Sequence, residues 1–330
     1  MPVARRRNPG RSQRYQRQAR SIPINVLVTG VSGFVGSHLA HTLIERGHTV
    51  VGLARRGAPG LPEHPRFRFV AADTTRSGSW QHHVAGVDTI VNLAGRSIFG
   101  RWTAAVKAEI RESRIRTTRN VIEAVPAGCP VRLISASGAG YFGSRGEDVL
   151  AEDEPVGTDF LATLSAEWEA EALRGGAKGL RVAAVRLGVV LAGDGGALAQ
   201  MIPAFRRFVG GPVGDGRQWF PWIHMDDLVS ALVFLADRPE LGGAFNLCAP
   251  EPVRNRELAA ALGRALNRPA VVPAPAFLLR AMLGEFADVL LASQRMVPRR
   301  LLQLGFEFDY PDIRAALRAI FGAGAGPERG

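Results

Sequence analysis

Apolar and polar positions along the chain form two alternating patterns, short continuous apolar runs and longer stretches with apolar residues at helical spacing. The first apolar run, residues 24–29, leads through a glycine-rich turn into a helical stretch that ends at Gly47. Similar runs, typical of buried strands, cover residues 49–54, 67–71, 89–93, 131–135 and 182–187. Helical stretches such as 104–125 and 160–173 separate them. This alternation predicts an α/β fold with a Rossmann-type, doubly wound parallel sheet and ligands at the carboxyl ends of its strands.

The turn after the first strand carries glycines at the spacing Gly30-x-x-Gly33-x-x-Gly36. One glycine permits the tight turn, another lets the backbone approach a pyrophosphate, and the third lets the helix pack against the strand. The helix N-terminus then offers unpaired N–H groups to the phosphates. Because the flanking strand and helix are both present, the pattern predicts dinucleotide binding. The residues expected to contact the dinucleotide here are Gly30, Ser32, Gly33, Phe34, Val35 and Gly36.

The second strand ends in Arg55-Arg56, where an acidic residue would hold the ribose 2′-hydroxyl of NAD. Arginine accommodates the 2′-phosphate of NADP, so the sequence favours NADP(H), although two solvent-exposed loop arginines are the alternative. Asp73 and the segment Leu93-Ala94-Gly95 follow later strands and complete the predicted cofactor site.

Composition and charge narrow the functional classes. Hydrophobic residues make up 46% of the 330 positions, which is sufficient for a large core. No apolar run is long enough to cross a membrane, and Cys129 and Cys248 stand apart from any metal-ligand pattern, so we expect no membrane span, no metal and a reducing, cytoplasmic location. The net charge of +11 includes seven arginines within residues 1–20, which leaves the remainder only mildly basic. Nucleic-acid binding is therefore not favoured.

The regular alternation of strands and helices ends near Gly188. Composition and periodicity together divide the chain into three segments. Residues 1–22 are interpreted as a disordered Arg-rich leader, with a targeting peptide as the alternative. Residues 23–188 form the NADP-binding Rossmann domain, to which later segments return. Residues 189–330 form a smaller α+β substrate lobe with a C-terminal helical extension. The sequence is compatible with a homodimer.

Beyond the glycine motif, several separated segments resemble the extended short-chain dehydrogenase/reductase superfamily, and in particular its atypical "epimerase family" branch. These segments are Asn92-Leu-Ala-Gly95, Arg101-Trp-Thr-x-x-x-Lys107, Glu112-Ser-Arg114, Ser135-Ala-Ser137, Gly140-Tyr-Phe-Gly143, Trp168-Glu169, Trp222-Ile-His-Met-Asp-Asp227 and Ala249-Pro-Glu-Pro-Val253. The resemblance covers nearly the whole chain after residue 24. It implies an NADP-dependent oxidoreductase or an epimerase-like enzyme with a small C-terminal extension.

Two features depart from the wider superfamily. Its Tyr-x-x-x-Lys pair, in which tyrosine transfers a proton and lysine holds the ribose, occurs nowhere in this chain. Leu161 and Ser165 occupy the two corresponding places. Phe220 stands where sugar-nucleotide epimerases carry an arginine for the substrate diphosphate, which disfavours a UDP-sugar substrate.

Three residues are candidates for the remaining chemistry. Tyr141 is the only phenol at the predicted ligand edge and would serve as the acid. Ser137 would donate a hydrogen bond to a carbonyl oxygen, and Lys107 would anchor a phosphate or act as a general acid. Against these interpretations, each residue also has a purely structural one. His224 with the following aspartates is better explained as a helix start with Asp as the N-cap.

Two functions are consistent with these residues. The first is an NADP(H)-dependent oxidoreductase acting on an unknown small carbonyl or alcohol, and the persistence of a full substrate lobe favours it. The second is an NADP(H)-binding regulatory or sensor protein without turnover. Absence of the Tyr-x-x-x-Lys pair favours the second, because loss of a poised proton donor slows the chemistry by roughly 10²- to 10⁴-fold.

Overall fold

The structure, a computed structural model, describes residues 22–322. The leader expected over residues 1–22 therefore lies outside the described residues except for Ile22, as does the end of the chain after residue 322. Within the described range, seven strands form one sheet in which all neighbours are parallel. In spatial order they are β11 (Gly243–Leu247), β7 (Arg181–Leu187), β5 (Arg132–Gly138), β4 (Thr89–Asn92), β1 (Asn25–Thr29), β2 (Thr49–Ala54) and β3 (Phe67–Ala71). The predicted Rossmann-type α/β fold is confirmed.

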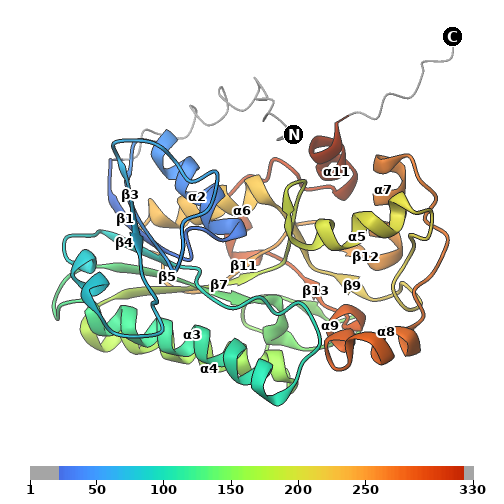
Figure 1. Cartoon of the computed structure of the whole chain (residues 1–330), viewed down its shortest axis with the longest axis horizontal. Helices are drawn as coiled ribbons and strands as arrows, with labels where there is room; N and C mark the ends of the chain where they lie inside the picture. Colours follow the sequence, from blue (N-terminus) through green and yellow to red (C-terminus); the bar gives the residue numbers. More distant parts are fainter. Residues whose placement is uncertain (1–21, 323–330) are drawn as a thin grey trace, which may run out of the picture.

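Helices cover both faces of this sheet, which explains why its strands are continuous apolar runs. Figure 1 shows α2 (Phe34–Glu45) and α6 (Met225–Ala236) above the sheet, and α3 (Ala104–Ala124) and α4 (Phe160–Leu173) below it. Successive residues of β1 point to opposite faces, so that Val28 packs in the core with α2 and α6 while Leu27 packs in the core beneath the sheet. The chain order changes direction at β1, because β2 lies on one side of it and β4 on the other. Such a switch point is where an open α/β sheet binds its ligand.

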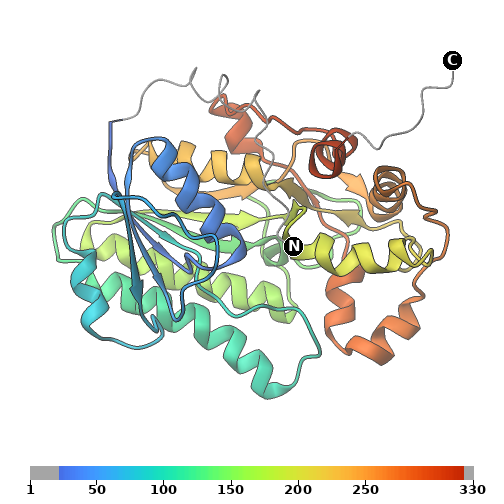
Figure 2. The ribbon, with the colours of Figure 1, turned by 45° about the horizontal axis from the view of Figure 1, so that its top comes forward.

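A second group of elements lies beyond the carboxyl ends of the strands (Figures 1 and 2). It is built around two-stranded pairings of β8 with β10, β9 with β12 and β6 with β13. The elements of this part are β6 (Val149–Leu150), β8 (Val189–Ala192), α5 (Gly196–Arg206), β9 (Trp219–Phe220), β10 (Trp222–His224), β12 (Val253–Arg254), α7 (Asn255–Leu266), α8 (Ala276–Leu283), α9 (Phe286–Leu291), β13 (Arg295–Met296) and α11 (Ile313–Phe321). Helix α10 (Arg299–Gln303) packs instead on β11 of the large sheet. Three short 3₁₀ helices complete the fold: η1 (Ser79–Val84), η2 (Ala139–Phe142) and η3 (Arg174–Lys178).

Segments after residue 189 are not confined to this second part. Helix α6 packs against α2, and β11 extends the large sheet by pairing with β7 in parallel register from Gly243 with Ala183 to Leu247 with Leu187. The chain thus crosses to the second part after β7 and returns to the sheet before entering α7. Because of this return, the polypeptide connects the large sheet to the second part more than once.

Candidate functional site

The glycine turn between β1 and α2 forms a closely packed loop of backbone. Gly30 has a φ of 70°, in the left-handed region, and a Cβ there would lie 3.0 Å from the backbone of Ala94. A Cβ at Gly36 would lie only 2.3 Å from the carbonyl oxygen of Gly30. Helix α2 starts after Gly33, which provides no side-chain cap, so its first N–H groups face the turn without a side-chain acceptor. This arrangement can bind phosphate oxygens through backbone N–H groups.

A buried chain of hydrogen bonds fixes the neighbouring strand end against this loop. The Thr29 hydroxyl at the end of β1 donates to Asn92 Oδ1 at 2.7 Å and accepts from the backbone N–H groups of Leu93 and Ala94 at 3.1 and 3.2 Å. Asn92 Nδ2 in turn donates to Thr118 on α3 at 2.9 Å. The predicted cofactor residues Leu93 and Ala94 are therefore held directly beside Gly30. Gly95 follows them and contacts the side chain of Arg114.

The two arginines after β2 lie at the outer end of the same edge. Arg55 and Arg56 are exposed, and neither forms an ion pair with any other residue between 22 and 322. Asp73 follows β3 and accepts hydrogen bonds from the backbone N–H and hydroxyl of Thr75, which lower the pKa of its carboxyl group, and Arg76 and Arg55 lower it further. This end of the edge thus combines positive charge with one ionised carboxylate.

The turn between β8 and α5 packs onto the first residue of α2. A Cβ at Gly195 would lie 2.8 Å from the Phe34 ring, and one at Gly196 would lie 2.5 Å from it. Nearby, His38 Nε2 lies 3.0 Å from Asp194 Oδ2. Glycines are required at these two positions because the aromatic ring occupies the space of their side chains. The predicted cofactor residue Phe34 therefore links the glycine turn to the second part of the molecule.

At the carboxyl end of β5, Ser137 and Tyr141 belong to one buried polar cluster. The Ser137 hydroxyl donates to Glu169 Oε1 on α4 at 2.7 Å. Arg186 on β7 donates to both oxygens of Glu169 at 2.9 Å, and its Cζ lies 3.4 Å from the centre of the Tyr141 ring. Arg186 also donates to the carbonyl oxygen of Glu152 at 2.9 Å. Three residues of β5, α4 and β7 thus fix the tyrosine ring on a guanidinium group.

The three candidates for acid–base chemistry occupy different environments. The Tyr141 hydroxyl makes no hydrogen bond to any part of residues 22–322, and its ring is partly buried. The Ser137 hydroxyl donates its single hydrogen to Glu169 in this structure, and its hydrogen bond to a substrate carbonyl stays a prediction. The Lys107 Nζ lies 2.7 Å from Glu285 Oε2 beside the Phe160 ring, and its role as a phosphate anchor or general acid stays a prediction.

The histidine and aspartates before α6 act as structural groups. Their capping role was anticipated, but the N-cap is His224 and not an aspartate, and His224 Nδ1 accepts from the Asp226 N–H at 3.1 Å. Asp227 is buried and accepts from the backbone N–H groups of Asp309 and Tyr310 at 2.8 and 3.0 Å. Burial is the main effect on its carboxyl group and raises the pKa of Asp227 to about 7.

The aromatic loop before β10 contributes to packing more than to an open pocket. Trp222 is 1% exposed. Trp219 donates from Nε1 to Glu147 at 3.0 Å, and the guanidinium carbons of Arg254 and Arg295 lie 4.2 and 4.7 Å from the centre of its ring. Phe220, the residue in place of the epimerase arginine, is partly buried and pairs with Val253. Trp219 and the three charged residues that contact it therefore form a cluster beside the segment that follows α9.

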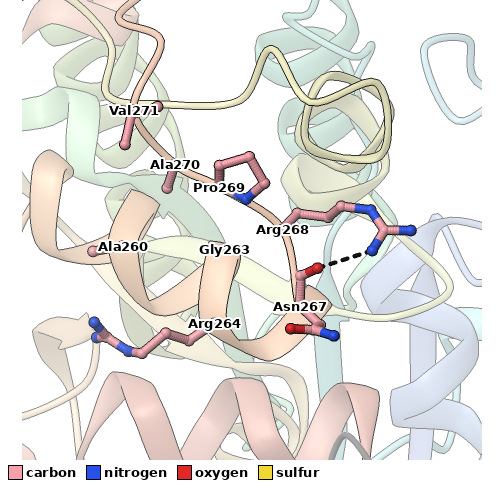
Figure 3. A pocket seen from close by; sticks show the side chains of 8 residues that line it. All are labelled: Ala260, Gly263, Arg264, Asn267, Arg268, Pro269, Ala270 and Val271. Atoms are coloured by element: carbon pink, nitrogen blue, oxygen red, sulfur yellow. Dashed lines mark hydrogen bonds between the residues drawn. The ribbon is translucent and has the colours of Figure 1, made fainter.

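Other features of the described residues do not add a second centre of chemistry. A surface hollow of about 480 Å³ lies at the end of α7 and contains none of the predicted site residues; Figure 3 shows its lining, with Arg268 donating to the carbonyl oxygen of Asn267. No group of three or more metal-ligating side chains occurs within residues 22–322. Among the same residues no helix is long and apolar enough to span a bilayer.

Sequence reasoning missed the roles of Glu169 and Arg186. A charged residue in the otherwise apolar run 182–187 was the available signal for Arg186, because a buried strand carries a charge only where a partner compensates it. Glu169 stood within a recognised motif, but its partners come from strands distant in sequence, and only the fold brings them together.

Comparison with known proteins places the chain among a defined set of relatives. A profile of the "NAD dependent epimerase/dehydratase family" matches residues 26–248, and a "Domain of unknown function (DUF1731)" matches residues 274–320. The chain is 43% identical over 301 residues to "Epimerase family protein SDR39U1 homolog, chloroplastic" of Arabidopsis thaliana, which covers 90% of this chain and 86% of the relative.

Solved structures show the same relationship. The human epimerase family protein SDR39U1, solved with NADPH, aligns with a TM-score of 0.79 and 34% identity over 90% of this chain and 99% of the human one. A nucleoside-diphosphate sugar epimerase from Corynebacterium glutamicum aligns with a TM-score of 0.72 and 33% identity over 91% of this chain and 59% of its own.

Proposed function

Because this chain belongs to the NAD-dependent epimerase/dehydratase family, we propose that it is an NADP(H)-dependent oxidoreductase that acts on a small carbonyl or alcohol compound. The relative described with NADPH shares 34% of its residues with this chain. The cofactor would supply or accept a hydride, and the residues of this chain would bind it, orient the substrate and handle the proton.

One observation carries the proposal: the glycine turn, its helix and two arginines that form no ion pair within residues 22–322 lie along one edge of the sheet. Gly30, Gly33 and Gly36 allow the close backbone packing that holds this turn against the N-terminus of α2, where N–H groups can bind a pyrophosphate. Arg55 and Arg56 provide positive charge where the 2′-phosphate of NADP would be distinguished from a 2′-hydroxyl. The residues present therefore fit NADP(H).

Tyr141 is the proposed proton donor. It follows β5 directly, its hydroxyl has no partner within residues 22–322, and Arg186 fixes its ring. Ser137 and Glu169 act through Arg186, as groups that position the tyrosine. A phenol held in this way can transfer a proton to a substrate oxygen without a lysine in the next turn of helix. Phe220, in the place where sugar-nucleotide epimerases carry an arginine, disfavours a substrate held by its diphosphate.

Fluorescence titration tests this proposal. The full chain is titrated with NADPH and with NADH, and the double variant Arg55→Ala/Arg56→Ala is titrated in parallel. A panel of aldehydes and ketones is then screened for oxidation of the bound NADPH, with Tyr141→Phe as the matched variant. We expect NADPH to bind more tightly than NADH, the double variant to lose that preference, and Tyr141→Phe to lose turnover while it retains NADPH. Absence of NADPH binding would overturn the proposal.

A sensor without turnover is the second candidate, and one contact favours it. The Ser137 hydroxyl donates to Glu169 and so does not point its hydrogen at a substrate carbonyl. A protein that only reports the NADPH/NADP⁺ ratio needs the cofactor site and no proton donor. Tight NADPH binding with no oxidation by any compound of the panel would favour this second function.

A cytoplasmic location is part of the same proposal. Its basis is that Cys129 and Cys248 are both free thiols in the described part of the chain, as is usual in a reducing compartment. The Arabidopsis relative is described as chloroplastic, so the two locations need to be distinguished. Imaging the full chain with a C-terminal fluorescent tag in its native cell tests this; confinement of the signal to an organelle would contradict the proposed location.

A further inference from the structure

Arg114 on α3 is a guanidinium group held in a fixed position at the edge of the proposed cofactor site. Its Nη1 donates to the carbonyl oxygens of Arg96 and Ile110 at 3.0 and 2.9 Å. Its Cζ lies 5.2 Å from the centre of the Trp168 ring on α4. Trp168 is itself fixed by the hydrogen bond that it donates to Thr118 at 2.9 Å. These contacts hold both the Arg114 side chain and the Trp168 ring on which it stacks.

The charge of Arg114 has no counterion. It forms no ion pair with any other residue between 22 and 322, whereas the nearby Arg186 and Arg119 each pair with a glutamate. Burial alone lowers the pKa of Arg114 to about 10, so the group is still a cation at neutral pH. Its remaining N–H groups have no partner within the described residues, yet they are not shut away from solvent. A ligand at this edge can use these N–H groups, and a largely desolvated cation without a carboxylate would be stabilised by the acceptor atoms of such a ligand.

The position of Arg114 indicates which ligand this is. Its guanidinium touches Gly95, so that a Cβ at Gly95 would lie 3.1 Å from Arg114 Cζ. Gly95 continues the segment that packs on Gly30, on the β4 and β5 side of the glycine turn and away from Arg55 and Arg56. In a doubly wound fold the two halves of a dinucleotide extend to opposite sides of this turn. Arg114 therefore borders the nicotinamide half.

The same region lacks the lysine that the wider superfamily uses to hold the ribose. Ser165, on α4, occupies the place of that lysine and is 6% exposed. Trp168 lies three residues further along the same helix and supports Arg114. The cation near this position is therefore Arg114 on α3, and not a residue of α4.

We propose that Arg114 binds the nicotinamide half of NADP(H), through its ribose hydroxyl or pyrophosphate oxygens, and so replaces the missing lysine as the cation of this half-site. This inference rests on the proposed cofactor. It assigns Arg114 to binding and not to proton transfer, because a guanidinium does not release a proton near neutral pH.

Two ligands separate this role from a purely structural one. The full chain is titrated calorimetrically with NADPH and with adenosine 2′,5′-bisphosphate, which lacks the nicotinamide half. In Arg114→Met we expect NADPH to bind about tenfold more weakly or worse, as loss of a charged hydrogen bond implies, with unchanged affinity for the bisphosphate. The matched control, Arg55→Ala/Arg56→Ala, is expected to weaken both ligands. The emission of bound NADPH should also shift in Arg114→Met only, because the nicotinamide loses a neighbour.

The outcomes are distinguishable. Wild-type protein that does not bind NADPH contradicts the proposed function itself. Wild-type binding with equal NADPH affinity in Arg114→Met, or with equal losses for both ligands, overturns the role of Arg114 alone. Should Arg114→Met fail to fold, Arg114→Lys decides: its ammonium is a compact point charge that cannot span the carbonyl oxygens on one side and the ligand on the other as the planar guanidinium does, so we expect a threefold or larger loss for NADPH only. Retention of full NADPH affinity would overturn the proposal.

Discussion

The Ser137 hydroxyl on β5 and the Glu169 carboxylate on α4 form a buried 2.7 Å hydrogen bond in which serine is the donor. The sequence predicts that a serine at this strand end binds a substrate, and in this structure its hydroxyl contacts Glu169. The same carboxylate accepts two hydrogen bonds from Arg186, which supports the Tyr141 ring. The serine therefore contributes to the position of the tyrosine, and its effect on turnover should be indirect.

Replacing Glu169 tests this cluster through stability. Glu169→Gln leaves Arg186, whose side chain is 4% exposed, without its charge partner. We expect a loss of about 3–5 kcal/mol in the free energy of unfolding, since removal of one member of a buried pair leaves the other charge uncompensated. Chemical denaturation measures it. Glu167→Gln on the same helix is the control: it breaks a pair with Arg111 whose side chains are 38% and 51% exposed, so about 1 kcal/mol or less is expected. Equal losses would contradict the account.

The turn glycines give a second prediction. Gly36→Ala places a Cβ 2.3 Å from the Gly30 carbonyl oxygen, and backbone must move to relieve that contact. We expect roughly 1–3 kcal/mol of destabilisation and loss of NADPH binding, because the displaced loop no longer presents its N–H groups. Gly176→Ala in η3 is the matched control, since nothing lies within 4 Å of the added atom. Thermal denaturation and NADPH titration of both variants check this prediction. Normal NADPH affinity in Gly36→Ala would show that the turn does not hold the cofactor.

Local sequence patterns predicted most of the sheet and the cofactor edge, and failed where residues meet across the fold. The apolar runs located β1, β2, β4 and β5 because these strands are largely buried, and they also located the edge strand β3, which is only partly buried. The geometry of the cofactor edge depends on the spacing of Gly30, Gly33 and Gly36, which lie within seven consecutive residues. By contrast, Lys107 meets Glu285 across 178 positions, and no local pattern predicts that contact. The N-cap at His224 was missed for a smaller reason, namely that Asp residues are the more common caps.

Asp227 predicts a dependence of stability on pH. Its folded-state pKa is about 7, above the ordinary value of 3.8, so the folded protein binds more protons than the unfolded chain between these values. The free energy of unfolding therefore falls as pH rises from about 4 to 7, by at most about 4 kcal/mol from this group. Denaturation of wild type and Asp227→Asn at pH 5 and pH 7.5 measures it. We expect a shallower pH dependence in the variant, and parallel curves would show that Asp227 does not titrate in this range.

Lys107 and Glu285 connect α3 to the segment before α9, and a double-mutant cycle measures what that contact contributes. The side chains are 30% and 58% exposed, so solvent screens the pair and the coupling free energy should be about 0.2–1 kcal/mol. Lys107→Met should also leave NADPH affinity unchanged, because its ammonium lies against Glu285 and not on the glycine turn. A large loss of NADPH affinity in Lys107→Met, with none in Glu285→Gln, would show that Lys107 binds the cofactor. Small and equal effects of both variants would show that Lys107 helps to attach the C-terminal segment and does not bind the cofactor.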